Sequence, residues 1–227
     1  MEHSLTFSQV RGQGYDGASN MQGSINGLKA LILNECKQAY FVHCFAHQLQ
    51  LTHVALAKKN SDCGWIFVDV LAPLLNFVGG SPKRKEFLRE KQRQHVVEAL
   101  SLGELETGTG LNQEQGLGRP CDTRWGSYFK SILNVLDLYS SILLSLDSIA
   151  EVFDTLDSNK AQAITHLLMS FDFMFVAHLM VDIFAITKEL NEALQKHDQD
   201  IMNAMAMVDV TKDNLQELRD EGFDMLM

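Results

Sequence analysis

Asp16 lies between glycines and small polar residues, in the segment GYDGASNM of residues 14–21. We expect this segment to join a strand to a helix, a position from which a carboxylate reaches a metal ion or a phosphate at the carboxyl edge of a sheet. The same residue types also form ordinary turns and helix caps. One carboxylate neither holds nor balances the two dications of a phosphoryl-transfer site, so both interpretations of Asp16 stay open.

Cys44 and His47 follow with C-x-x-H spacing, which places both side chains near the same turn. A structural zinc site needs four ligands, usually as two close pairs, and no second pair with matching spacing follows. The alternatives are a buried cysteine at a strand end with a backbone-bonded histidine, or a functional histidine that faces the same crevice as Asp16.

The densest basic segment of the chain runs from residue 82 to residue 95. Its basic residues are Lys83, Arg84, Lys85, Arg89, Lys91 and Arg93, set against Glu86 and Glu90. Such a segment can follow a phosphate backbone. It can equally be a solvated helix face with charge pairs one turn apart.

Arg124 and Trp125 stand at the expected start of a long helix. Arginine pairs with phosphate and tryptophan stacks on an exposed base, which suits a nucleic-acid contact. Against this, Asp122 or Thr123 is a plain helix cap, and Trp125 is a plain core anchor.

The first 60 residues predict a strand–helix–strand–helix order. Residues 5–10 alternate apolar and polar side chains as a strand does, and 12–14 give a glycine turn. Helical spacing follows to residue 34 with Ser19 or Asn20 as the cap, and a β-rich run over 40–45 precedes a second helix to residue 56. A crossover of this length predicts parallel strands at the edge of an α/β sheet.

Helical periodicity dominates the rest of the chain. A glycine-proline stop lies at 79–82, and the glycine-rich stretch 103–119 predicts a mobile loop. Helices are expected over 65–77, 83–99, 125–149, 161–194 (with room for one interruption) and 198–226. We therefore divide the chain into an α/β part, residues 1–60, and a helical part, residues 61–227.

Composition favours a folded protein, with 46% hydrophobic residues in 227 and a formal charge of −10. The charge is uneven: residues 1–136 carry 14 basic and 12 acidic side chains, and residues 137–227 carry 5 and 17. Any polyanion should therefore contact the first part. Residues 1–4 show no secretory signal, no uninterrupted apolar run predicts a membrane span, and the four cysteines are expected to be reduced thiols.

Three motifs occur in a fixed order: GYDGASNM at 14–21, HCFAHQLQL at 43–51 and DTRWGS at 122–127. Together they resemble the transposase-like part of hAT-superfamily proteins, in the group with a TTF-type zinc finger and a zinc-finger-MYM-like domain of unknown function (DUF4371-like). The resemblance covers nearly the whole chain. It implies a partial ribonuclease-H-like core followed by a mostly α-helical insertion, so that the fold is predominantly α.

The resemblance also implies roles for single residues. Asp16 matches the second of three acidic residues that bind Mg or Mn in active members, His47 is expected near that site, and Arg124 with Trp125 is expected to handle DNA. The other two acids of the family and its TTF finger have no counterpart here, as in a protein truncated at both ends. We therefore expect a non-catalytic chain that binds no metal cofactor by itself, because one carboxylate lacks the charge to hold the ions.

The expected function is that of a domesticated or degenerate transposase-derived protein in the nucleus. It would bind DNA through Arg124, Trp125, Lys83, Arg84 and Lys85, with no membrane and no small-molecule substrate. The alternative is a helical module that binds protein partners, in which the transposase motifs remain without their original function. In either case a sheet without its neighbouring strands exposes unpaired edges.

Overall fold

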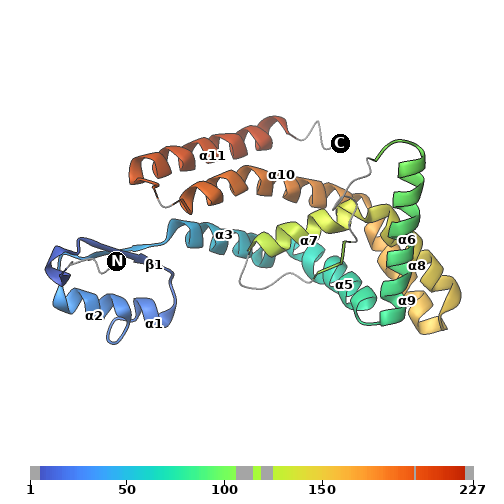
Figure 1. Ribbon diagram of the computed structural model, residues 1–227, viewed down its shortest axis with the longest axis horizontal. Helices are drawn as coiled ribbons and strands as arrows, with labels where there is room; N and C mark the ends of the chain where they lie inside the picture. Colours follow the sequence, from blue (N-terminus) through green and yellow to red (C-terminus); the bar gives the residue numbers. More distant parts are fainter. Residues whose placement is uncertain (1–5, 106–114, 119–124, 197, 223–227) are drawn as a thin grey trace.

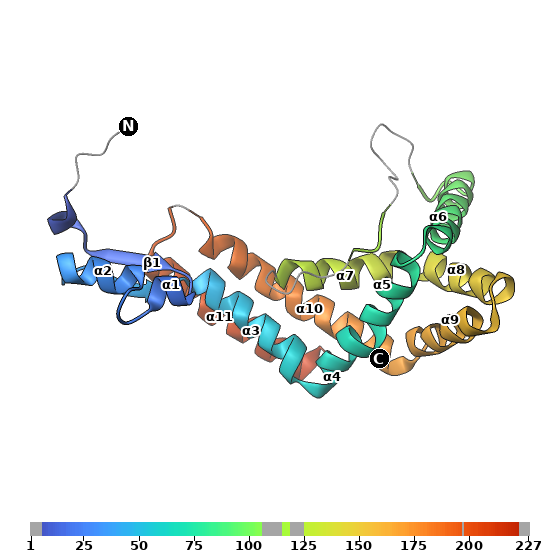
Figure 2. The ribbon, with the colours of Figure 1, turned by 90° about the horizontal axis from the view of Figure 1, so that it is seen from below.

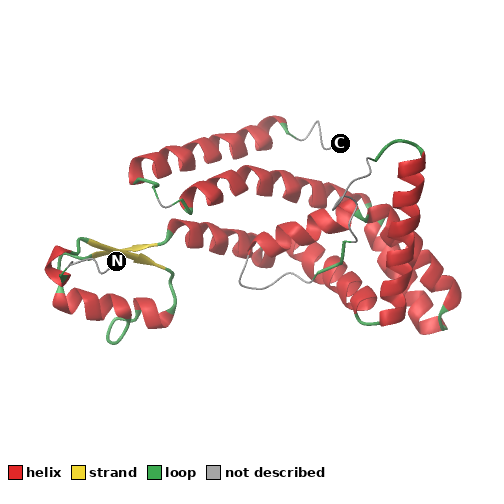
Figure 3. Cartoon of the chain, viewed as in Figure 1, coloured by secondary structure: helices red, strands yellow, loops and turns green. Residues whose placement is uncertain are grey.

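The computed structural model describes residues 6–105, 115–118, 125–196 and 198–222. Helices hold 77% of the residues and strands 4%, which confirms the expectation of a predominantly α protein. The molecule is elongated, with a small α/β unit at one end from which a single helix leads into a long helical body (Figures 1 and 3). The view from below shows the same separation (Figure 2).

The α/β unit contains two parallel strands, β1 (Gly12–Tyr15) and β2 (Tyr40–His43). Gly12 lies opposite Tyr40 and Tyr15 opposite His43. The predicted parallel pairing is confirmed, because the connecting helices α1 (Ser19–Gln22) and α2 (Leu28–Glu35) return the chain to the start of the sheet. Within the described residues these two strands are the whole sheet.

The predicted strand over residues 5–10 is wrong. Phe7–Gln9 forms a short 3-10 helix, η1, in which the Thr6 backbone N–H donates to Gln9 Oε1 at 2.8 Å. This capping box outweighs the apolar alternation of the segment. The strand instead covers the predicted turn, because the side-chain amide of Gln13 donates to Ala39 O at 2.8 Å and ties this segment to the start of β2.

The predicted helix over 21–34 is interrupted between α1 and α2. Gly23 and Gly27 pack backbone to backbone, and a Cβ on Gly27 would lie 2.3 Å from the nitrogen of Gly23. Only residues without side chains allow this approach. Helix α1 begins at Ser19 with Ala18 as its N-cap, one residue before the predicted cap.

Helix α3 (Phe45–Lys59) extends from the sheet into the helical body, where it contacts helices α7 and α10. The side chain of Asn60 then accepts from the backbone N–H groups of Asp62 and Cys63 and starts α4 (Ser61–Trp65). Helix α4 continues through a π-helical turn, η2 (Ile66–Leu71), into α5 (Ala72–Gly79). The predicted helix over 65–77 lies inside this continuous stretch.

By length and composition alone, the helical stretch of residues 61–79 could cross a membrane, although Asp62 and Asp69 interrupt its apolar run. Half of this stretch is buried inside the protein, with Ile66, Leu71 and Leu74 in the core. The bent pairs α7–α8 and α9–α10 qualify only if each pair is counted as one span. No membrane-spanning helix is clearly indicated among the described residues.

The predicted stop at 79–82 is confirmed. Helix α5 ends at Gly79, and α6 (Pro82–Ser101) begins with Ser81 as its N-cap and Pro82 in its first turn. Of the predicted loop at 103–119, residues 106–114 and 119 lie outside the described part of the chain. Gly103 adopts a φ of 75° just after α6, a conformation that favours glycine.

Five helices complete the body: α7 (Trp125–Asp137), α8 (Tyr139–Val152), α9 (Thr155–Leu168), α10 (Phe171–Leu194) and α11 (Ile201–Glu221). The single helix predicted over 125–149 is therefore two, bent by 71° at Leu138. The interruption expected within 161–194 is confirmed, with Ser170 capping α10 and a bend of 60°.

The helical body holds the hydrophobic core. Its buried members come from α3, η2 and α5 to α10 and include Ile66, Leu74, Ile132, Ile149, Leu168 and Phe184. Residues 6–44 contribute no side chain to this cluster. The α/β unit therefore keeps its own small set of buried residues, Cys36, Ala39 and Ala46.

Candidate functional site

The carboxyl edge of the two strands brings the first group of predicted residues together. Asp16 follows the last residue of β1, and Cys44 follows the last residue of β2. The backbone N–H of Cys44 donates to Tyr15 O at 3.0 Å, which holds the two strand ends side by side. His47 lies in the first turn of α3, so all three residues are at the same edge.

Asp16 is exposed and takes part in a local turn. Its Oδ1 accepts from the backbone N–H of Ala18 at 3.1 Å, which is the geometry of an Asx turn before α1. This hydrogen bond gives Asp16 a structural role in the turn. The side chain is otherwise exposed to solvent.

His43 is the residue at this edge that sequence reasoning did not single out. Its imidazole packs against Gly17, where a Cβ would lie 3.1 Å from Cε1 and 3.3 Å from Nε2. The Nε2 atom is shielded from solvent and has no hydrogen-bond partner among the described residues. The signal in the sequence is the glycine after Asp16, since a side chain there would displace this ring.

His47 continues the cluster, with its ring centroid 5.4 Å from that of His43. Cys44, which lies between these two histidines in the sequence, has a half-buried side chain. It is a free thiol, as are Cys36 and Cys63, and Cys121 lies outside the described residues. Cys36 donates from Sγ to Val10 O at 3.4 Å, at the opposite end of the strands. It is therefore not placed to join Cys44 as a zinc ligand.

The donor set at this edge does not fit a dication. Within the described part of the chain, no group of three or more histidine, cysteine, aspartate or glutamate side chains is placed to hold a metal ion. Asp16 contributes a single carboxylate, and Mg²⁺ or Mn²⁺ requires several oxygen ligands. No chemical step through a metal is derived from these residues.

Helix α6 carries the second group, and its packing decides which cations face solvent. The helix lies against α8 with Leu88, Gln92 and Ala99 buried. Lys85, Arg89 and Arg93 stand four residues apart on the solvent side, and we call these three residues the basic stripe. The side chains of Arg89 and Arg93 are 55% and 73% exposed, so both reach solvent.

Two of the predicted phosphate-binding residues on α6 have partners inside the protein. Arg84 forms an ion pair with Asp157, donates from Nε to Phe77 O at 2.7 Å and stacks over the Phe77 ring. The ammonium group of Lys83 lies 4.5 Å from the centre of the Phe153 ring. Arg84 therefore joins α6 to α5 and α9. The exposed cations of α6 are instead those of the basic stripe.

Arg89 and Arg93 belong to the predicted basic segment 82–95, although Lys83, Arg84 and Lys85 were the residues singled out from it for DNA binding. The signal that could have identified them is the i, i+4, i+8 spacing of Lys85, Arg89 and Arg93, which places them on one side of a helix. Arg84 and Lys83 lie beside this row in sequence but on flanks that face neighbouring helices.

The third group lies elsewhere. Trp125 begins α7, and Arg124 lies outside the described residues. Helix α7 runs along the helical body, the sheet lies at one end of the molecule, and α6 lies toward the other end (Figures 1 and 2). Among the described residues, the structure therefore places Asp16, Cys44 and His47 together at the sheet edge. Lys83, Arg84 and Lys85 lie on α6, and Trp125 lies at the start of α7.

Comparison with known families gives a match at the start of the chain. The model of the family DUF4371, described as "ZMYM1/FAM200, RNase-like domain", matches residues 1–27. The matched residues include the GYDGASNM motif, and the second and third motifs lie beyond them. No solved structure matches the chain. The start of this chain is thus similar to the RNase-like domain of the DUF4371 family.

Proposed function

We propose that this chain is a transposase-derived, DUF4371-like protein that binds DNA through the basic stripe of α6 and does not cleave DNA by itself. The match of residues 1–27 to an RNase-like family domain supports the origin. The single observation that carries the DNA-binding proposal is the exposed row of Lys85, Arg89 and Arg93.

The spacing of the stripe suits a phosphate backbone. At about 1.5 Å of rise per residue, successive cations lie roughly 6 Å apart along the helix and the row spans roughly 12 Å. Lysine and arginine gain binding energy from DNA by releasing its counterions. The stripe lies in residues 1–136, which carry two more basic than acidic side chains.

The acids on α6 do not cancel the stripe. Arg89 lies 3.5 Å from Glu86, and Arg93 lies 2.6 Å from Glu90, in exposed pairs one turn apart. Hydrogen bonds from Gln94 and Arg93 lower the pKa of Glu90, so this acid stays ionised. Exposed pairs of this kind are worth less than about 1 kcal/mol, and a phosphate can replace the carboxylate in each.

The residues at the sheet edge are the reason that we propose no DNA cleavage. Asp16 is one carboxylate of an Asx turn, and two-metal phosphoryl transfer needs several carboxylates that share the ions. We propose Asp16 and His47, beside His43, as vestigial residues of such a site, and a nuclear location that suits a DNA-binding protein. Imaging of a fluorescent fusion tests the location, and an endonuclease assay with Mg²⁺ or Mn²⁺ tests the inactivity.

The decisive experiment is salt-dependent binding to a fluorescein-labelled DNA duplex, followed by anisotropy. If three cations each contact a phosphate, log K should fall with log[salt] with a slope of about −2.7, since each contact contributes about −0.9. The variant Lys85→Glu, Arg89→Glu, Arg93→Glu should lose this binding.

The matched control reverses three exposed cations of the acidic half, Lys188→Glu, Lys212→Glu and Arg219→Glu, and so makes the same change in net charge. It should bind DNA nearly as the unchanged protein does. Equal losses in both variants would mean that only net charge matters, and the α6 interface would be rejected.

A second candidate function, a module for protein partners, is supported by the open face of the sheet. Tyr40 is 73% and Val42 48% exposed, and Ile25 and Leu31 nearby in the α/β unit are 79% and 51% exposed. Apolar side chains on an unpaired sheet are typical of surfaces that another chain covers. Salt separates the two candidates, because binding through an apolar surface changes little as ionic strength rises.

A further inference from the structure

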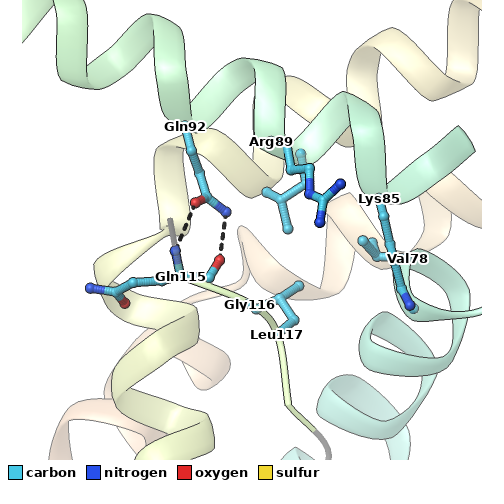
Figure 4. Close-up of a pocket in the computed structure, with 9 residues that line it drawn as sticks. Val78, Lys85, Arg89, Gln92, Gln115, Gly116 and Leu117 are labelled. Atoms are coloured by element: carbon cyan, nitrogen blue, oxygen red, sulfur yellow. Dashed lines mark hydrogen bonds between the residues drawn. The ribbon is translucent and has the colours of Figure 1, made fainter. Parts of the chain in front are cut away.

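Residues 115–118 lie as a short extended segment between α6 and α7, and side chains from both helices bind their backbone. Gln92, which is 92% buried, donates from Nε2 to Gln115 O at 3.0 Å and accepts from the Gln115 N–H at 3.3 Å (Figure 4). Ser131 Oγ, on α7, donates to Gly118 O at 3.1 Å. Asn134 Nδ2 donates to Gly116 O at 3.4 Å.

All four bonds go to main-chain atoms, so the groove recognises a peptide backbone and not a particular sequence. The amide of Gln92 offers one donor and one acceptor to one residue, as the neighbouring strand of a sheet does. Buried polar side chains such as Gln92 and Ser131 need partners, so the groove is costly to leave empty.

The segment fills the groove incompletely. A hollow of about 240 Å³ lies on the α6 side of it, between Val78, Leu88 and Leu117, with Lys85 and Arg89 at the edge (Figure 4). A second hollow of about 480 Å³ lies on the α7 side, against Phe129 and Leu133. Gly116 borders both hollows, and a Cβ on Gly116 or Gly118 would meet no atom within 4 Å.

We infer that the α6–α7 groove is a binding site for an extended peptide of another protein, and that residues 115–118 occupy it within this chain. A partner with a β-branched side chain at the position of Gly116 would form the same backbone bonds and fill part of the hollows, and the position of Gly118 has room for a second such side chain. It would also lose less backbone freedom on binding, because glycine is the most flexible residue in the unbound state.

Leu117 is the side chain that holds the internal segment, since it packs half-buried against the core. Leu117→Ala therefore weakens the competitor without altering the walls of the groove, and an external peptide should bind more tightly. Gln92→Leu alters the groove itself and should weaken the same peptide. The opposite directions distinguish a binding site from a merely structural contact.

The test uses the full chain and a fluorescein-labelled peptide that copies residues 112–118 with Gly116→Val and Gly118→Val, followed by anisotropy. We expect Leu117→Ala to bind it about tenfold more tightly than the unchanged protein, because the internal segment competes less. Adding Gln92→Leu to Leu117→Ala should cost about tenfold, because two backbone bonds are lost. The matched control is Gln94→Leu on the exposed side of the same helix, which should have no effect.

Three results would overturn the inference. The first is no binding to the Leu117→Ala protein at about 1 mM peptide, an affinity worth only about 4 kcal/mol. The second is equal affinity for Leu117→Ala and the unchanged protein. The third is an equal effect of Gln92→Leu and Gln94→Leu, which can be measured in the unchanged background if Leu117→Ala does not fold by circular dichroism.

Discussion

His53 is a buried histidine on α3, 5% exposed, with the edge of its ring toward Phe184 of α10. Burial lowers the pKa of His53 from 6.5 to about 4, because the charged imidazolium loses its hydration there. The neutral ring is thus part of the interface that fixes α3, and with it the α/β unit, to the helical body.

The free energy of unfolding should therefore depend on pH through His53. Its folded pKa is below its unfolded value, so the full contribution is present above pH 6.5 and is lost as the pH falls toward 4. The loss amounts to about 3 kcal/mol. Urea unfolding between pH 7 and pH 4 measures it, and His53→Leu should flatten this part of the curve. Exposed His95→Leu is the control, and an unchanged slope in His53→Leu would refute the assignment.

Arg84 has a structural role. Its ion pair with Asp157 is mostly shielded from solvent, with side chains 16% and 19% exposed. Arg84→Ala would leave Asp157 without its partner and Phe77 O without a donor, and should lower the free energy of unfolding by about 2 kcal/mol. Arg93→Ala, which breaks the exposed pair with Glu90, should cost less than about 0.5 kcal/mol. Chemical denaturation compares the two, and equal costs would contradict this distinction.

Among the elements, α11 is held more loosely than the other long helices. It pairs with α10, and Ala204 and Thr211 are its only buried residues, while Ile201, Met202, Met205 and Val210 remain more than half exposed. A helix with so little buried surface opens locally at low cost in free energy.

Its N-cap gives a direct test. Asp200 Oδ1 accepts from the backbone N–H of Asn203 at 2.9 Å, and Oδ2 accepts from the Asn203 side chain at 2.7 Å. Asp200→Ala should cost about 1 kcal/mol in this helix alone. Hydrogen exchange should then quicken in α11 and stay the same in α8 and α9. Asp198→Ala, exposed and two residues earlier, should change neither, and uniform acceleration would show that α11 does not open independently.

At the scale of the whole molecule, the chain consists of a core-bearing helical body and an α/β unit that adds nothing to that core. The open face of the sheet makes the unit the region of the surface most prone to association. The elongated shape in Figures 1 and 2 keeps this face away from the basic stripe. DNA binding on α6 and protein contact at the sheet are therefore compatible in one chain.

Val42→Lys should reduce concentration-dependent association of the full chain, because a charge on an open sheet opposes edge and face pairing. Light scattering at increasing protein concentration measures this. Val97→Lys is the matched control, since Val97 is 61% exposed but lies on α6. An equal improvement in both variants would mean that net charge, and not the sheet, controls solubility.

Local chemistry allowed much of the fold to be predicted from sequence. Ser81 and Pro82 mark the start of α6, and apolar periodicity locates most helices. The helical segment before residue 40 is long enough for a crossover and predicted parallel strands, although the first strand was placed at 5–10 and lies at 12–15. Each of these features depends on residues within about one or two turns of each other, or on chain length alone. Asp16, Cys44 and His47 could be placed together for the same reason, because parallel strands end at one edge.

Only the tertiary structure decided which residues the fold leaves available. Asp157, 73 positions away in the sequence, draws Arg84 inward and leaves Lys85, Arg89 and Arg93 as the exposed row. Gln92 meets Gln115 across a groove, and the long apolar pattern after residue 125 bends at Leu138 to enclose a core. Partners so distant in sequence are selected by packing in three dimensions, so the sequence determined the helices and the sheet edge, and the fold determined what each of them presents.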